Sequence, residues 1–254
     1  MKTKLKLAGK AAFVNGVGRA PRLGAWFEKL SCWIEFSRWC VEKGAVAGKY
    51  GTDSGLSQSP RYGLYESVIK REELDANAFD YLEFGVYRGD SIAWWRTRIV
   101  HPNAQFIGFD TFTGLPEQWY EGARSGAFST AGEPPVMDDA RVCFHVGLFQ
   151  ETLPKFVQGF ARNKKLVIHL DADLYSSTLF VLVSVASLLR PGDLLFFDEF
   201  ATPTHEFRAF NDFVKAYGLQ YEVIGAVNNF NQLCLKVVAM RGMEITRKCI
   251  DEEV

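Results

Sequence analysis

Two apolar runs that each end in a pair of acidic residues constrain the fold of this chain more than any other feature. The first run, KLVIHL at residues 165–170, is followed by Asp171 and Asp173. The second run, DLLFF at residues 193–197, is followed directly by Asp198 and Glu199. Strands that are buried on both faces of a parallel sheet read as continuous apolar stretches, so both runs are predicted to be strands of this kind.

The four acids that follow these runs are expected to meet in space. Open α/β sheets bind their ligands beyond the carboxyl ends of the strands, and both acidic pairs lie at such ends. Carboxylates crowded together repel one another unless a divalent cation compensates their charge or their pKa values rise strongly. The sequence therefore indicates either a cation site or a group of protonated acids at one edge of one sheet.

The composition is that of an ordinary globular protein and narrows the classes of partner. The chain has 254 residues, of which 48% are hydrophobic and 23% charged, and its formal net charge is −1. Such a balance argues against nucleic acid or an anionic membrane as the main partner.

The five cysteines are scattered without CxxC spacing, as is typical of reduced thiols. No signal peptide and no run of ~20 apolar residues is evident, so we expect a cytoplasmic protein.

Residues 1–60 are expected to form an N-terminal helical extension to a core domain at residues 61–254. Apolar residues recur at helical spacing between Leu23 and Val41, which predicts a helix there. This helix either packs on the core, serves as a lid, or presents exposed tryptophans to a dimer contact. A loop rich in Gly and Ser is predicted at 44–60, followed by a helix at 61–73.

The core begins with a predicted strand over 79–84 that leads into a turn with Gly85 and Gly89. Glycine lets the backbone turn sharply and approach a ligand, and the free N–H groups of a helix start attract anionic groups. Asp90 and Ser91 follow as candidate N-caps of the next helix. A tight turn between a strand and a helix is the alternative interpretation of this segment.

The next predicted strand, 105–109, ends in Asp110. This is where a ribose-binding acid belongs in a nucleoside-binding βαβ unit. Residues 111–141 then form a connection too long for an ordinary βα loop, and loops of this length are usually functional lids or disordered. Three embedded aromatic side chains favour an ordered lid: Trp119, Tyr120 and Phe128.

Predicted strands and helices alternate through the rest of the core. Strands are expected at 142–146, 165–170 and 194–197, and helices at 153–162, 176–189 and 204–217. The last two strands, 221–226 and 232–239, are separated by a link too short for a crossover helix, so they should pair as an antiparallel hairpin. The predicted fold class is α/β, with a doubly wound, mostly parallel, Rossmann-like sheet of seven strands that ends in this hairpin.

Several ordered motifs together resemble a known family. They are EFGV at 83–86 with Gly89 and Ser91, FDTF and GLP within 109–116, GLF and TLP within 147–154, and LDADLYSST with FFDEF at the two acidic runs. Over residues 62–239 this combination resembles the macrocin O-methyltransferase family. That family comprises metal-dependent class I methyltransferases that use S-adenosylmethionine to methylate hydroxyls of sugars and related natural products.

The resemblance implies roles for particular residues. It implies that Asp171, Asp198 and Glu199 hold a divalent cation, expected to be Mg²⁺, and that Asp173 is the general base. Asp110 would hold the ribose hydroxyls of the cofactor. The other implied cofactor contacts are Glu83, Gly85, Tyr87, Arg88, Gly89, Ser91 and Gly147. The sequence departs from the family at Glu199, where Asp is usual, and the longer side chain can alter the coordination geometry or the preferred metal.

The chemistry of such a reaction explains these residue types. A sugar or aliphatic hydroxyl is a poor nucleophile because its pKa lies far above 7, and a divalent cation lowers that pKa and fixes the oxygen. Asp173 is not needed as a ligand and can take the proton. Its alternative role is the N-cap of the helix at 176–189. His205 is a second catalytic candidate, at the acceptor pocket, or else a solvent-exposed residue of a first helical turn, and His169 is expected to be a core residue.

Two other classes of function stay open at this point. LDADLY also resembles the DxD motif of nucleotide-sugar glycosyltransferases, although that fold does not require Glu83, Asp110 or the second acidic pair. A non-catalytic cofactor-binding domain is the other class, but four uncompensated carboxylates would destabilise a protein with no use for a metal. The expected partner is a small-molecule hydroxyl acceptor, with a sugar or glycoside favoured, and a homo-oligomer is compatible with the sequence.

Overall fold

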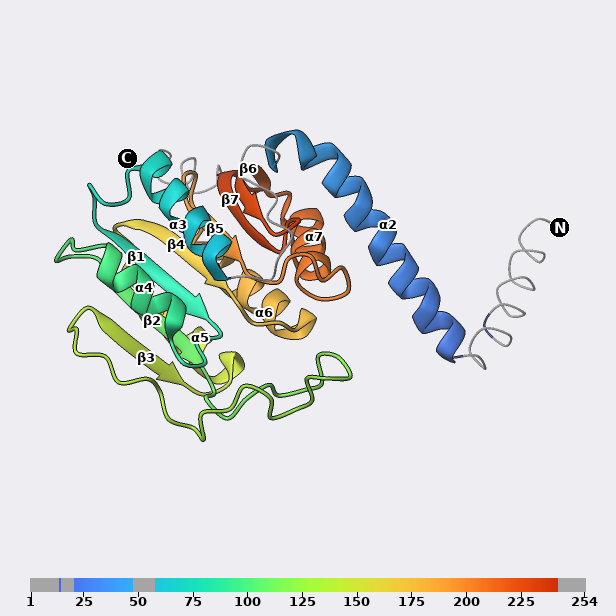
Figure 1. Cartoon of the computed structure of the whole chain (residues 1–254), viewed down its shortest axis with the longest axis horizontal. Coiled ribbons are helices and arrows are strands. Elements are labelled where there is room, and N and C mark those ends of the chain that lie inside the picture. The colour runs from blue at the N-terminus through green and yellow to red at the C-terminus, as the bar shows by residue number, and fades with distance from the viewer. Residues whose placement is uncertain (1–13, 15–20, 48–57, 242–254) are drawn as a thin grey trace, which may run out of the picture.

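Residues 14, 21–47 and 58–241 are described by the computed structural model, in which helices cover both faces of a seven-stranded sheet (Figure 1). The strand order is β3-β2-β1-β4-β5-β7-β6. The strands from β3 to β5 in this order are parallel, whereas β7 is antiparallel to β5 and β6 is antiparallel to β7. The predicted α/β fold with its terminal hairpin is confirmed.

The strands are β1 (Phe79–Phe84), β2 (Gln105–Asp110), β3 (Val142–Val146), β4 (Lys165–Leu170), β5 (Leu194–Phe197), β6 (Gln220–Val227) and β7 (Gln232–Ala239). β1 and β5 are buried along their whole length and β4 along nearly all of it, as the continuous apolar runs predict. The register pairs Glu83 with His169 and Phe84 with Leu170. The central strands therefore end at the same level.

The helices are α2 (Pro21–Ala47), α3 (Gln58–Glu72), α4 (Asp90–Arg98), α5 (Phe149–Gly159), α6 (Tyr175–Val185) and α7 (Glu206–Tyr217), and α6 continues into a 3-10 turn, η1 (Ala186–Leu188). α3 and α4 cover one face of the sheet, where Tyr65 and Trp95 are buried with Tyr81. α5, α6 and α7 cover the other face, where Leu153 is buried with Leu82. Tyr81 and Leu82 thus point to opposite faces, as the two-residue repeat of a strand requires.

α2 is attached to the body through one of its faces. Phe36 and Trp39 are buried, and the ring of Phe36 lies 5.1 Å from that of Phe207. Trp39 Nε1 donates a hydrogen bond to the hydroxyl of Tyr221 at 2.7 Å. The amino-terminal half of α2 projects away from the sheet (Figure 1). None of the helices in the described ranges, the 27-residue α2 included, has the length and hydropathy of a membrane-spanning segment.

Several helices begin earlier or later than predicted. α2 continues to Ala47 and α3 begins at Gln58, so both ends of the loop predicted at 44–60 are helical, while residues 48–57 lie outside the described ranges. α5 begins before the predicted residue 153, because the Glu151 carboxylate accepts the Leu148 N–H at 3.1 Å and stabilises an earlier first turn.

The predicted cap of α4 is wrong, and so is the alternative role of Asp173 as a helix cap. The N-cap of α4 is Gly89, with a φ of 80°, so Asp90 and Ser91 lie in the first turn instead. α6 begins at Tyr175 after Leu174, and no side chain caps it. Asp173 is therefore not the N-cap of α6, and this alternative role for its carboxylate is removed.

Candidate active site

A cavity of about 340 Å³ opens at the carboxyl ends of the central strands. Most of the site residues expected from the sequence line it, namely Glu83, Gly85, Tyr87, Arg88, Ser91, Asp110, Asp171, Asp173, Asp198 and Glu199. Three expected site residues are not among the lining residues: Gly89, Gly147 and His205. The cavity size falls in the range of small-molecule and cofactor sites.

The turn after β1 is tied to the turn after β4. Asp171 N donates to Phe84 O at 2.9 Å, and Gly85 N donates to Phe109 O at 3.0 Å. Gly85 has a φ of 92°, and a Cβ at this position would lie 1.9 Å from the carbonyl oxygen of Asp171. Only glycine fits this approach, which sets the first acid of the LDADLY segment beside the glycine turn.

Asp110 fixes the backbone of the same turn. Its Oδ2 accepts the N–H groups of Val86 and Tyr87, each at 2.8 Å, and its Oδ1 accepts the N–H of Phe112 at 2.8 Å. Tyr87 and Phe112 both have positive φ, at 51° and 58°. A carboxylate offers about four acceptor sites, so these bonds leave capacity for a ligand hydroxyl. Asp110 therefore holds the turn in addition to lining the cavity.

Glu83 lies beneath the glycine turn. It is 1% exposed, and its Oε2 accepts a hydrogen bond from the Tyr81 hydroxyl at 2.8 Å. Burial raises the pKa of Glu83 well above its usual range. A ligand group that binds Glu83 would therefore bind a carboxyl group that already accepts a hydrogen bond from Tyr81.

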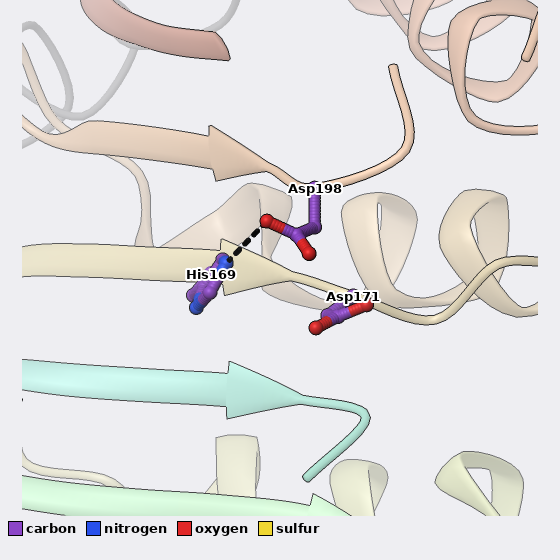
Figure 2. A group of neighbouring side chains, drawn as sticks. All are labelled: His169, Asp171 and Asp198. Atoms are coloured by element: carbon purple, nitrogen blue, oxygen red, sulfur yellow. Dashed lines mark ion pairs between the residues drawn. The ribbon is translucent and has the colours of Figure 1, made fainter. Parts of the chain in front are cut away.

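The two acidic runs bring Asp171 and Asp198 together with His169 at the ends of β4 and β5 (Figure 2). One ligand atom from each of the three side chains lies within 4.8 Å of the others, and His169 Nε2 is 3.8 Å from Asp198 Oδ1. Glu199 is not part of this group. Its Oε2 instead accepts a hydrogen bond from Asn231 Nδ2 at 3.0 Å.

Burial makes the acids resist ionisation. Burial, and next the charge of Asp198, raises the pKa of Asp171 to about 7. Burial, and next the charge of Asp171, raises the pKa of Asp173 to about 9. Burial also raises the pKa of Asp198 to about 6 and that of Glu199 to about 7. These are the raised values expected of crowded carboxylates without a compensating cation.

The donor set fits a divalent cation. Among the described residues, no hydrogen-bond donor reaches Asp198 Oδ1, although this side chain is 1% exposed. An unpaired buried carboxylate oxygen is costly, and a cation between Asp198 and Asp171 would satisfy it. Carboxylate oxygens are also the ligands that Mg²⁺ and Mn²⁺ prefer.

Arg61 is a site residue that the sequence did not reveal. Its guanidinium forms an ion pair with Asp198 Oδ2, and its Nη1 lies 3.3 Å from the hydroxyl of Ser91. Arg61 lies in α3 and lines the same cavity as the acids. An arginine in the first turns of a helix carries no local motif, so only the topology could have identified it.

Glu206 is a second buried acid that the sequence did not reveal. It is fully buried at the start of α7, and its Oε2 accepts the backbone N–H of Glu199 at 3.0 Å. Burial raises its pKa well above the usual range. Glu206 thus fixes the backbone of the second acidic pair through this hydrogen bond.

Asp173 has the exposure and the backbone geometry of a functional group. It is 8% exposed, lines the cavity, and has a φ of 58°. Non-glycine residues held in this left-handed region store strain that is typical of functional sites.

His205, the second catalytic candidate, precedes α7, and its Nδ1 accepts the Tyr175 N–H at 3.4 Å. His205 is half-buried rather than solvent-exposed.

The long connection over 111–141 lies at the cavity. Trp119 and Phe128 line it, and the Ser176 hydroxyl donates to Glu117 Oε1 at 2.5 Å, which ties this connection to α6. Apart from a bridge between Tyr120 and Ala123, the connection contains neither helix nor strand. The segment expected to act as a lid thus borders the space where a ligand would lie.

Part of the cavity lies in a segment that is similar to a known protein domain. Residues 82–200 match the family model described as a methyltransferase domain. No curated protein matches the chain. The crystal structure of CalS11, a calicheamicin methyltransferase, superposes with a TM-score of 0.55 at 23% identity, covering 71% of this chain and 80% of that chain. The O-methyltransferase NovP superposes with a TM-score of 0.53 at 19% identity, covering 69% and 77%.

These comparisons confirm the expected class I methyltransferase fold. The matched segment runs from β1 through both acidic pairs and so includes the floor of the cavity.

Proposed function

We propose that this protein is an O-methyltransferase that uses S-adenosylmethionine and a divalent cation to methylate a hydroxyl of a sugar or another small natural-product acceptor. The methyltransferase domain match supports the reaction class. The macrocin O-methyltransferase resemblance supports the hydroxyl acceptor, and the fold is shared with a calicheamicin methyltransferase and an O-methyltransferase. The observation that carries the proposal is the meeting of two acidic pairs beside a glycine turn in one cavity.

The cofactor is assigned to the part of the cavity between the glycine turn and Asp110. S-adenosylmethionine, when bound, supplies the methyl group on its sulfonium. The Asp110 carboxylate would accept hydrogen bonds from the ribose hydroxyls. Glu83 and Ser91 would border the methionine moiety, with the start of α4 offering free N–H groups. Gly85 lines this space and, because it carries no side chain, lets the Asp171 backbone lie beside the turn.

The cation is assigned to Asp171 and Asp198, with Glu199 as the third carboxylate that the family resemblance implies. A divalent cation held there would lower the pKa of the acceptor hydroxyl and fix its position. In this structure Glu199 faces Asn231, so a role as ligand requires its carboxylate to turn. Arg61 would balance the remaining negative charge through Asp198.

Asp173 is assigned as the proton acceptor in its ionised form. A cation held by Asp171 would favour that form, because it would offset the Asp171 charge that helps to raise the pKa of Asp173. The acceptor oxygen forms a bond to the methyl carbon while the carbon–sulfur bond breaks, and the hydroxyl proton moves to an Asp173 oxygen. S-adenosylhomocysteine and the methyl ether are the products. The Asp173 carboxylate suits this task because it lines the cavity and does not cap α6.

Calorimetry of ligand binding tests the proposal and separates it from a glycosyltransferase. The full chain with Mg²⁺ should bind S-adenosylmethionine with a micromolar dissociation constant, near −8 kcal/mol. Binding of a nucleotide sugar without binding of S-adenosylmethionine would overturn the proposal in favour of DxD chemistry.

A further inference from the structure

We propose that the imidazole of His169 is a nitrogen ligand of the cation site, and that this protein therefore prefers a first-row transition metal to Mg²⁺. The inference rests on the proposed function and deepens it, because the resemblance assigns only carboxylates to the cation. It departs from the expectation that His169 is a plain core residue.

The hydrogen bonds around His169 determine which ring nitrogen is free. The Tyr81 hydroxyl has one hydrogen, and it donates this hydrogen to Glu83 Oε2 at 2.8 Å. Tyr81 also lies 2.7 Å from His169 Nδ1. When Glu83 is ionised and accepts the Tyr81 hydrogen, the phenol oxygen accepts at this contact and Nδ1 carries the proton. In the neutral imidazole the lone pair is then on Nε2.

The free nitrogen faces the unpaired carboxylate oxygen. His169 Nε2 lies 3.8 Å from Asp198 Oδ1, and the two side chains are 1% and 2% exposed (Figure 2). Protein nitrogen and oxygen ligands lie about 2.0–2.2 Å from a metal such as zinc, so two atoms on one metal are at most about 4.4 Å apart. The observed separation fits a shared cation. A direct hydrogen bond would need a shorter contact.

Arg61 leaves this oxygen available. The guanidinium engages Asp198 Oδ2, which directs the other carboxylate oxygen, Oδ1, toward His169. The Tyr65 hydroxyl lies 3.4 Å from Nε2, which is long for a hydrogen bond. The 3.8 Å between Nε2 and the unpaired Oδ1 leaves room for a cation that both atoms would bind.

The imidazole changes the metal that the site selects. Oxygen-only sites suit Mg²⁺, whereas imidazole ligands suit zinc, copper, iron and nickel, and the affinity of a given site rises from Mn²⁺ through Fe²⁺, Co²⁺ and Ni²⁺ to Cu²⁺. The buried chain from Glu83 through Tyr81 to His169 also orients the ring as a ligand, in the way that hydrogen-bonded groups behind a metal-bound histidine do. The glycine-turn side of the cavity and the cation side are thereby connected through one hydrogen-bonded path.

Pulsed electron paramagnetic resonance of the Mn²⁺-loaded full chain tests the inference without any substitution. We expect nitrogen modulation from the bound Mn²⁺, with frequencies that change when the histidines are labelled with ¹⁵N. Bound Mn²⁺ without any histidine nitrogen coupling would overturn the role of His169 and leave the proposed function intact. Absence of any divalent cation binding would overturn the proposed cation site as well.

Two variants assign the signal among the four histidines of the chain. His169→Gln should lose the nitrogen modulation and weaken Co²⁺ binding about 10-fold or more, while Mg²⁺ binding changes much less. His101→Gln, at a site remote from the cavity lining, should leave the modulation and both affinities unchanged. Retention of the nitrogen signal in His169→Gln would contradict the inference, and the labelled wild-type spectrum still decides it if this variant does not fold.

Discussion

Arg61 in α3 forms an ion pair with Asp198, the first residue after β5. The two residues are separated by 137 positions in the sequence and meet only because α3 packs on the face of the sheet next to the carboxyl edge. The pair places a permanent positive charge among four acids. It explains how the chain tolerates this cluster before any ligand arrives.

Loss of that charge should destabilise the cation-free protein. In Arg61→Gln the buried Asp198 loses its partner, and we expect a decrease of about 2–3 kcal/mol in the free energy of unfolding. The Arg61 side chain is 16% exposed, so the loss should stay below that of a fully buried pair. Urea denaturation in the presence of a chelator measures this decrease in the free energy of unfolding.

Arg208→Gln is the matched control, because Arg208 pairs with Glu28 at a solvent-exposed position of 36% and 54% side-chain exposure. Its loss should stay below about 1 kcal/mol. Equal losses in the two variants would mean that the charge of Arg61 does not compensate the acids.

The raised acid pKa values predict an unusual pH dependence. In the folded protein the pKa values of Asp171, Asp198 and Glu199 are about 7, 6 and 7, whereas unfolded acids titrate near ~4. The folded state then binds more protons, so the stabilisation is complete below about pH 4 and is lost as the pH rises through 6 to 7. The melting temperature without cation should therefore fall between pH 5 and pH 8.

A divalent cation should flatten this dependence, since it holds the carboxylates in their charged form. Differential scanning fluorimetry with a chelator and with saturating Mn²⁺ makes the comparison. Identical pH profiles in the two conditions would argue against a cation at these acids.

The contact between Gly85 and Asp171 predicts a steric effect. A methyl group at residue 85 would lie 1.9 Å from the Asp171 carbonyl oxygen, in a backbone with positive φ. Gly85→Ala should therefore cost about 4 kcal/mol or more. Gly126 has a similar φ of 85° but nothing within 4 Å, so Gly126→Ala should show only the backbone cost of about 1–2 kcal/mol. Chemical denaturation of both variants separates the two contributions, and equal costs would refute the close approach.

The sheet could be predicted from the sequence, because its buried strands are visible as runs of apolar residues. β1, β3, β4, β5 and β7 have the predicted bounds, and the short link between the last two strands required a hairpin. Helix ends were less predictable, because the Leu148 N–H and the φ of Gly89 depend on local geometry that no periodicity encodes.

The site residues at the ends of strands could be predicted from the sequence. Those that reach the site through the packing of helices on the sheet could not. Asp171 and Asp198 meet because β4 and β5 are neighbours, which the order of the elements indicates. Arg61 and Glu206 reach the acids from helices on opposite faces of the sheet, and no motif links either residue to them. His169 is buried in the core, as its apolar neighbours in β4 predict, but its position 3.8 Å from Asp198 could not be predicted from the sequence.

The assignment of Asp173 as proton acceptor predicts a selective loss of turnover. Asp173→Asn keeps size and polarity but cannot take the proton, so turnover should fall by roughly 10²- to 10⁴-fold. Cation and S-adenosylmethionine affinities should stay nearly unchanged. Release of S-adenosylhomocysteine with any hydroxyl acceptor that the wild-type protein methylates measures the rate. Full activity in this variant would mean that the proton leaves by another route, for which His205 is the candidate to test next.

The central claim is that the ends of β4 and β5 together hold a divalent cation in the cofactor cavity. Calorimetric titration of Mn²⁺ into the wild-type protein and into Asp171→Asn, with Asp138→Asn in the exposed part of the long connection as control, tests it most directly. We predict one bound cation in the wild-type and control proteins, and an affinity at least about 100-fold lower in Asp171→Asn. Equal Mn²⁺ affinity in all three proteins would contradict the claim.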